Sequence, residues 1–272
     1  MARIGAVIRG IDRISPRVAA RVAARIFLTP RRSRLPPREG AWLEQARSET
    51  FTAGRFRLAG HRWSRSGDPV LLVHGWEGRG SQLGGLALAL ARQGLQPISI
   101  DLPAHGASPG KQTNLLEIAD TVSAMVKHVG GVAGIVAHSF GAAGTTVALR
   151  NALSVGRLVY LAPSEDFDHY PNLFGRWLGL PIPLRDRMKR SIEGRLGTTM
   201  AELRGRLLAP TMKTPLLVVH DQHDADVPWL DGKTYHQAWP GATLLTTQGL
   251  GHRRILRDQG VLTSVAGFFG AK

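Results

Sequence analysis

The sequence predicts an α/β fold in which a mostly parallel central sheet is flanked by helices. From residue 51 onward, short apolar runs alternate with stretches of helical periodicity, and serial units of this kind build a parallel sheet covered on both faces. The chain has 272 residues, of which 43% are hydrophobic and 20% charged. This length and composition suffice for a large globular core and exclude fibrous and wholly disordered classes.

The individual elements follow from the periodicity along the chain. Residues 51–58 and 61–64 are expected to form an opening antiparallel pair of strands. Later strands are expected at 70–74, 97–101, 134–138, 157–162, 215–220 and 242–246. Helices are expected at 81–92, 115–129 and 141–153, with a final helix from about Arg253.

Two regions differ from this alternation. Residues 1–50 are predicted to form a basic N-terminal helix and a connector rich in Pro and Arg, ahead of a main domain at 51–270. Residues 164–210 show no strand pattern and are predicted to be a small helical cap inserted over the sheet. Ser15 and Pro16 are typical of a helix start, and Thr29-Pro30 of its end. This helix carries adjacent basic and apolar stripes: Arg17, Arg21 and Arg25, then Val18, Val22 and Ile26.

Charge and composition limit the classes of function. Most of the formal net charge of +15 lies in residues 1–65, which lack the clustered aromatic residues of a single-strand binder, so nucleic-acid binding is not expected. The absence of Cys excludes a disulfide framework, a thiolate nucleophile and Cys-ligated zinc. Charged residues interrupt every apolar stretch near the start, and glycines interrupt the uncharged run 128–149, so neither a secretory signal peptide nor a transmembrane helix is expected.

These features together predict a cytoplasmic protein. They leave open a peripheral contact of residues 1–30 with an anionic membrane, for which a basic amphipathic helix is suited. A helix packed on the body with its arginines in water is the simpler interpretation. The oligomeric state cannot be read from the sequence.

The most informative segment surrounds Ser139. A buried apolar strand runs directly into the small residues of Ala137-His138-Ser139-Phe140-Gly141, which allow a sharp turn before a helix. Such a turn exposes the hydroxyl at the carboxyl edge of the sheet. A serine becomes a useful nucleophile only when a base takes its proton, so a histidine and an orienting carboxylate are expected on later loops.

The sequence supplies both groups in order. Asp224 follows the strand expected at 215–220, and His252 follows the strand expected at 242–246. Open α/β sheets place their sites at these strand ends, and the interval between Asp224 and His252 has room for one helix and one strand. Other acids in reach are Asp221 and Asp226 in the same loop, and more distantly Glu165 or Asp166.

Over residues 51–270 the chain resembles an α/β-hydrolase of the serine-esterase type. Besides the turn at Ser139, the segments 71–76 and 101–108 resemble the family's His-Gly loop and Asp-x-Pro-x-His-Gly-x-Ser turn. The resemblance implies Ser139 as nucleophile, His252 as general base and Asp224 as its orienting acid. It also implies that the backbone N–H groups of Trp76 and Phe140 form an oxyanion hole. Ala137 departs from the family's Gly-x-Ser-x-Gly pattern, for which we expect a slightly adjusted turn.

Several other residues near these motifs have a structural role as the simpler interpretation. His74 and His105 are expected to bond loop backbone, and His138, Phe174 and Trp177 are weaker candidates for lining a substrate pocket. A metal site at residues 220–224 and a dinucleotide site at Gly78–Gly84 are both disfavoured, the latter because Leu83 occupies the third glycine position.

The function predicted is a serine hydrolase, foremost a carboxylesterase that cleaves small or medium acyl esters through an acyl-enzyme on Ser139, with no cofactor and no metal. Thioesterase, lactonase, C–C bond hydrolase and acyltransferase activities use the same residues and stay open. A non-catalytic binding protein on the same fold is the alternative from another class.

Overall fold

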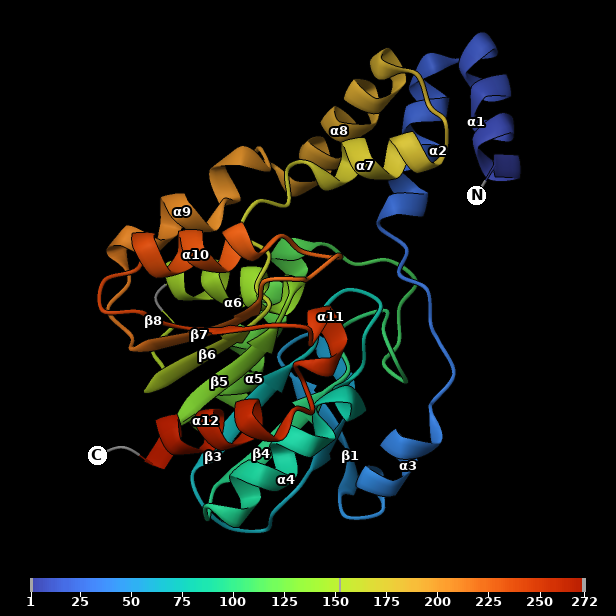
Figure 1. Ribbon diagram of the computed structural model, residues 1–272. Helices are drawn as coiled ribbons and strands as arrows, with labels where there is room; N and C mark the ends of the chain where they lie inside the picture. Colours follow the sequence, from blue (N-terminus) through green and yellow to red (C-terminus); the bar gives the residue numbers. More distant parts are fainter. Residues whose placement is uncertain (1, 152, 271–272) are drawn as a thin grey trace.

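The computed structural model describes residues 2–151 and 153–270, and within them eight strands form one sheet (Figure 1). The spatial order is β1-β2-β4-β3-β5-β6-β7-β8. Strand β2 is antiparallel to both of its neighbours, β1 and β4, and every neighbouring pair from β4 to β8 is parallel. The strands are β1 (Arg47–Ala53), β2 (Phe56–Arg62), β3 (Pro69–Val73), β4 (Gln96–Ile100), β5 (Gly134–His138), β6 (Arg157–Leu161), β7 (Leu216–Asp221) and β8 (Thr243–Thr247). This is the fold class that the sequence predicts.

Helices cover both faces of the sheet. They are α1 (Ala2–Ile14), α2 (Pro16–Phe27), α3 (Pro37–Leu43), α4 (Gly84–Arg92), α5 (Leu115–His128), α6 (Phe140–Arg150), α7 (Tyr170–Trp177), α8 (Ile182–Leu196), α9 (Gly205–Leu208), α10 (Trp229–Ala238), α11 (Gly251–Arg254) and α12 (Gln259–Gly270). Short 3-10 turns lie at Gly80–Leu83, Ala201–Leu203 and Ala209–Thr211.

The central strands are buried on both faces, so their side chains divide between two cores. In β6, Leu158 and Tyr160 join the core beneath α5, α6 and α10, whereas Val159 and Leu161 join the core beneath α4 and α12. This alternation follows from the period of two along a strand. It explains why these strands read as continuous apolar runs in the sequence.

The first strands begin earlier than the sequence predicts. The expected pair at 51–58 and 61–64 is instead β1 and β2, and β1 already starts at Arg47. As an edge strand, β1 exposes its first residues, so Arg47 and Ser48 carry no apolar alternation that would reveal it.

The connector rich in Pro and Arg contains a short helix. Helix α3 begins at Pro37, where proline is favoured because the first helical N–H has no partner. Its Trp42 packs on α4, where a Cβ added to Gly84 would lie 2.8 Å from the Trp42 Cβ. The prolines therefore mark a helix start as well as a connector.

The N-terminal helices and the inserted segment pack together above the sheet. Helix α2 lies against α8 and α7, and α1 lies against α2 (Figure 1). The predicted helix after Ser15 is confirmed as α2, but its buried residues are Ala19, Ala20, Ala23 and Ala24, while Val18 of the expected apolar stripe is 45% exposed. Small alanines allow the two helix backbones to approach closely. None of the described helices combines the length and apolar character needed to cross a membrane.

Candidate active site

Ser139 lies at the turn between β5 and α6, at the carboxyl end of the central strand β5. Its backbone has φ 55° and ψ −123°, a conformation that residues other than glycine rarely adopt. Two glycines permit the close approach of the neighbouring loop. A Cβ on Gly141 would lie 2.4 Å from the carbonyl oxygen of His74, and one on Gly75 would lie 2.8 Å from the Ser139 Cβ. The turn keeps this geometry with the buried Ala137 in place of glycine.

Three side chains that the sequence singles out meet at this turn. The Ser139 Oγ lies 3.0 Å from His252 Nε2, and His252 Nδ1 lies 2.8 Å from Asp224 Oδ2. The carboxylate accepts the Nδ1 proton, which leaves Nε2 free to accept the hydroxyl proton. This chain of groups can move a proton from the serine to the imidazole while the carboxylate stabilises the resulting positive charge.

The environment of Asp224 favours its ionised form. Burial alone would raise the pKa of this carboxyl, because its side chain is fully buried. Hydrogen bonds from His220 and His252, the charge of His252 and the N–H of Val227 outweigh burial and hold the pKa well below its usual range. Asp224 therefore stays negative beside His252 at neutral pH.

His220 is a second imidazole on this carboxylate that the sequence does not assign to the site. Its Nε2 lies 3.4 Å from Asp224 Oδ2 and 3.2 Å from the Val227 carbonyl oxygen. The side chain is fully buried at the end of β7. Its position four residues before Asp224 is the sequence signal that could have identified it.

His138 supports the position of His252. Its Nε2 donates to the backbone oxygen of His252 at 3.0 Å, and the two rings lie 4.5 Å apart. Burial, followed by the neighbouring His252, lowers the pKa of His138 well below the usual value, so its ring stays neutral. The structure therefore puts His138 beneath the imidazole that faces Ser139.

His74 fixes the loop on the other side of Ser139. Its Nε2 accepts the N–H of Leu102 at 3.0 Å, so the proton lies on Nδ1, which donates to the Gly75 oxygen at 2.7 Å. Burial lowers the pKa of His74 well below its usual value. His105 donates to the oxygen of Pro103, also within a loop. Both histidines bond loop backbone, as expected.

Trp76 and Phe140 flank the serine. Their rings are 5.7 Å apart, and Phe140 is the first residue of α6, where an N–H has no acceptor within the helix. The ring of Phe167 lies 5.8 Å from that of Phe140. Phe167 is therefore an apolar neighbour of the site that the sequence does not assign to it.

The two cap aromatics predicted as weak substrate-binding residues lie elsewhere. The ring of Phe174 contacts Phe27 of α2 at 5.4 Å, and Trp177 at the end of α7 is 64% exposed. Sequence reasoning could not foresee this because Phe27 of α2, which lies far earlier in the chain, packs against Phe174.

The alternative acids have other partners. Asp221 accepts the backbone N–H groups of His223 and Leu250 and the hydroxyl of Thr247, which ties two loops together. The Glu165 carboxylate accepts the N–H of Arg206. In residues 2–151 and 153–270, no group of three His, Asp or Glu side chains could hold a metal ion.

The dinucleotide alternative is also not favoured. A dinucleotide site needs an acid for the ribose at the end of the next strand, where Asp101 follows β4. The Asp101 carboxylate instead accepts the N–H of Gly80 at 2.7 Å and that of Ala107 at 2.7 Å. The carboxylate thus joins two loops of the protein. An open depression of about 350 Å³ lies instead beside His252, lined in part by Leu250 and Arg253.

The sheet order and the turn at Ser139 define an α/β protein of the hydrolase type. The sequence profile of the alpha/beta hydrolase family matches residues 70–263, and the chain belongs to this family. A comparison with curated protein sequences found no match.

Solved structures of esterases are similar in fold. An esterase from Exiguobacterium antarcticum superposes with a TM-score of 0.66 at 14% identity, covering 83% of this chain and 100% of its own. An esterase from Pyrococcus furiosus gives 0.66 at 19% identity, with coverages of 89% and 98%. The protein Est1E from Butyrivibrio proteoclasticus, with ferulic acid bound, gives 0.64 at 16% identity, with coverages of 81% and 96%.

Proposed function

We propose that the protein is a serine hydrolase that cleaves carboxylic esters with small or medium acyl groups. The observation that carries the proposal is the continuous hydrogen-bonded chain from Ser139 Oγ through His252 to Asp224, at 3.0 and 2.8 Å. The likeness of the fold to esterases supports the substrate class.

The reaction follows from the geometry in two stages. Ser139 Oγ attacks the acyl carbon while His252 Nε2 takes the hydroxyl proton, and the N–H groups of Phe140 and Trp76 stabilise the oxyanion. The leaving alcohol then receives the proton from His252, and an acyl-enzyme remains. A water molecule deprotonated by His252 attacks this ester and releases the acid.

The residues around Ser139 support an apolar acyl group. The aromatic rings of Trp76, Phe140 and Phe167 form a chain of edge-to-face contacts beside the serine. Rings in this arrangement favour an alkyl or aryl chain over a charged one.

The test is hydrolysis of p-nitrophenyl esters from acetate to laurate by the parent protein and Ser139→Ala. We expect the variant to lose about 10³-fold or more in kcat, because removal of the nucleophile leaves only binding and oxyanion stabilisation. The matched control is Ser264→Ala on α12, whose hydroxyl donates to the Gly260 oxygen, and it should retain full activity.

A fluorophosphonate probe followed by mass spectrometry identifies the reactive residue independently. Labelling at Ser139 without turnover of oxygen esters, but with turnover of a thioester or lactone series, would replace the ester proposal with one of these reactions. Equal activity in the parent and Ser139→Ala, or the absence of labelling, would overturn the serine hydrolase mechanism. The hypothesis of a non-catalytic binding protein on the same fold would then be favoured.

A further inference from the structure

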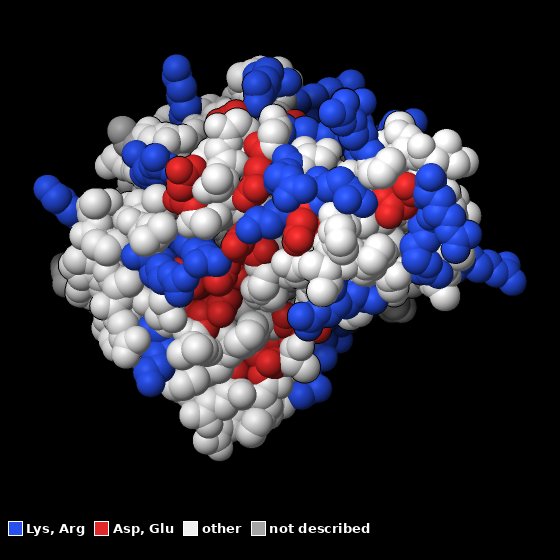
Figure 2. Space-filling model, turned by 90° about the horizontal axis from the view of Figure 1, so that it is seen from above, with Lys and Arg blue, Asp and Glu red and all other residues white. Residues whose placement is uncertain are grey.

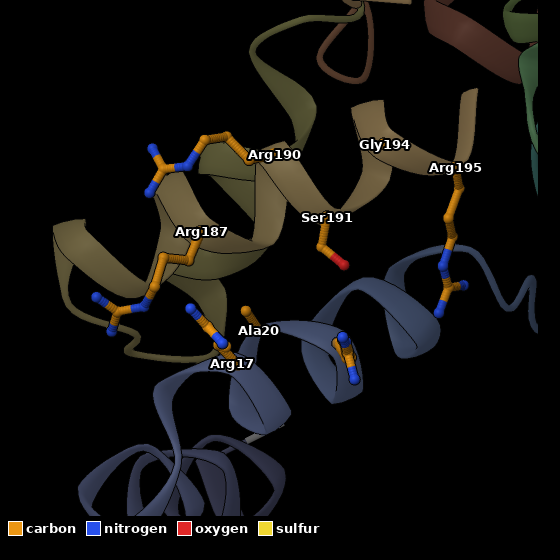
Figure 3. A pocket seen from close by; sticks show the side chains of 8 residues that line it. Arg17, Ala20, Arg187, Arg190, Ser191, Gly194 and Arg195 are labelled. Carbon is orange, nitrogen blue, oxygen red and sulfur yellow. The ribbon is translucent and has the colours of Figure 1, made fainter. Parts of the chain in front are cut away.

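A groove rich in arginine lies between α2 and α8, away from Ser139. It has a volume of about 630 Å³, and within the described part of the chain its lining includes Arg17, Arg21, Arg187, Arg190 and Arg195 (Figure 3). The side chains come from both helices, and small residues keep its floor open: a Cβ added to Gly194 would meet nothing within 4 Å. The groove is therefore a concave surface of one charge sign.

Little negative charge balances these arginines. Among residues 2–151 and 153–270, the ion pair of Arg187 with Asp12 at 2.8 Å is the single one that they form. Guanidinium groups that share a groove repel one another and donate in a geometry that matches phosphate oxygens. Figure 2 shows Lys and Arg side chains spread over the face seen from above, including its right-hand side, where Figure 1 places α1 and α2. A phosphate-bearing ligand would satisfy this surface.

The neighbouring helix α1 carries an apolar stripe that faces water. The residues of this stripe lie within one face of α1, at intervals of three and seven residues. Ile4, Val7 and Ile14 are 40%, 63% and 88% exposed, and Val18 in the next helix, α2, is 45% exposed. Contiguous exposed apolar residues of this kind mark interaction surfaces.

The position of α1 is fixed on its other face. A Cβ on Gly5 would lie 1.8 Å from the carbonyl oxygen of Leu178, so only glycine permits this approach. Arg9 Nη1 donates to the backbone oxygens of Leu178 and Gly179 at 3.1 and 3.0 Å. Because α1 is held by this buried face, the exposed stripe is a stable feature of the surface.

We propose that α1, α2 and α8 form a docking surface for an anionic phospholipid bilayer. The groove arginines bind lipid phosphates, and the α1 stripe enters the boundary between headgroups and acyl chains. A soluble phosphate would account for the groove and leave the stripe uncovered. A second copy of the chain would cover the stripe and bring two basic surfaces together. The inference is independent of the proposed hydrolase activity.

The test is co-sedimentation of the full chain with vesicles of phosphatidylcholine alone or mixed with an equal part of phosphatidylglycerol. We expect binding to the mixed vesicles that weakens with salt. The double variant R17A/R21A should lower the partition coefficient about 30-fold, on the basis of the contribution of each basic residue near an anionic surface. The control R65A/R92A removes the same charge from two exposed positions outside the groove and should stay within about twofold of the parent.

A second variant, V7D/I14D, tests the stripe, and we expect at least tenfold weaker binding to the mixed vesicles. Circular dichroism of each variant checks the fold, since all of these positions are exposed. Equal losses in R17A/R21A and R65A/R92A would overturn the proposal. Unchanged vesicle binding in V7D/I14D, together with binding of inorganic pyrophosphate measured by calorimetry, would point to a soluble ligand and would also overturn the proposal. A parent dimer that V7D/I14D converts to a monomer, without vesicle binding, would assign the stripe to a second copy and also overturn it.

Discussion

Glu39 anchors the segment between the N-terminal helices and the sheet. Its carboxylate, 4% exposed, accepts Arg79 Nε at 2.6 Å and Nη2 at 3.2 Å, and the Ser81 hydroxyl at 2.7 Å. Arg79 also donates to the oxygen atoms of Ser33. Helix α3 is thereby bound to the loop that follows β3 and carries Trp76.

Glu39→Ala is expected to lower the free energy of unfolding by about 3–5 kcal/mol. The variant leaves the Arg79 guanidinium, which is 11% exposed, as an unpaired buried charge, and breaking a buried pair from one side has this cost. Replacing both partners, in E39L/R79L, removes the stranded charge and should cost less than Glu39→Ala alone.

Urea unfolding of each variant at pH 7 measures these differences. The control is Arg55→Ala, which breaks the pair with Asp120, whose two side chains are 69% and 51% exposed. An exposed pair of this kind contributes at most about 1 kcal/mol. If Glu39→Ala and Arg55→Ala destabilise the protein equally, the inference that this pair anchors α3 is wrong.

Three further predictions concern the neighbourhood of the serine. Burial lowers the pKa values of His74 and His138, so their contribution to stability is complete above about pH 6.5 and falls as the pH drops below it, because only the unfolded chain takes up the protons. The raised pKa of Glu165 acts in the opposite sense, and urea midpoints that rise on acidification would contradict the prediction. Gly75→Ala puts a Cβ 2.8 Å from the Ser139 Cβ and should lower kcat/KM about 100-fold, and unchanged ester hydrolysis would argue against the close loop approach. His138→Phe removes the hydrogen bond to the backbone oxygen of His252, the proposed general base, and should lower kcat about 10-fold at constant KM, with partial recovery in His138→Gln.

The sequence predicts the central sheet well because the apolar runs in the sequence coincide with the strands that the structure buries. Strands buried on both faces, such as β5 (Gly134–His138), need continuous apolar runs, and the turn at Ser139 needs small residues around it. The proximity of Ser139, Asp224 and His252 follows from the shared carboxyl edge of parallel strands. These features depend on the chain's own periodicity and on sheet geometry.

The features that the sequence does not reveal depend on contacts between distant segments. From the sequence alone, Phe174 and Trp177 suggest the lining of a pocket. The structure shows instead that Phe27 of α2 packs against Phe174. On α2 the larger Val18 suggests a buried stripe, yet the helix packs through its alanines because they allow a closer approach to α8. No periodicity within one segment encodes which partner will cover it.

The packing of α2 on α8 constrains the order of events during synthesis. Helix α2 ends at Phe27, whereas α8 ends at Leu196. At about 5–20 residues per second, a ribosome needs on the order of 10–30 s to make the chain between them. During this interval α2 lacks α8, and the first six strands of the sheet, β1 to β6, are made. Helix α2 therefore cannot take its final place until most of the sheet has been translated.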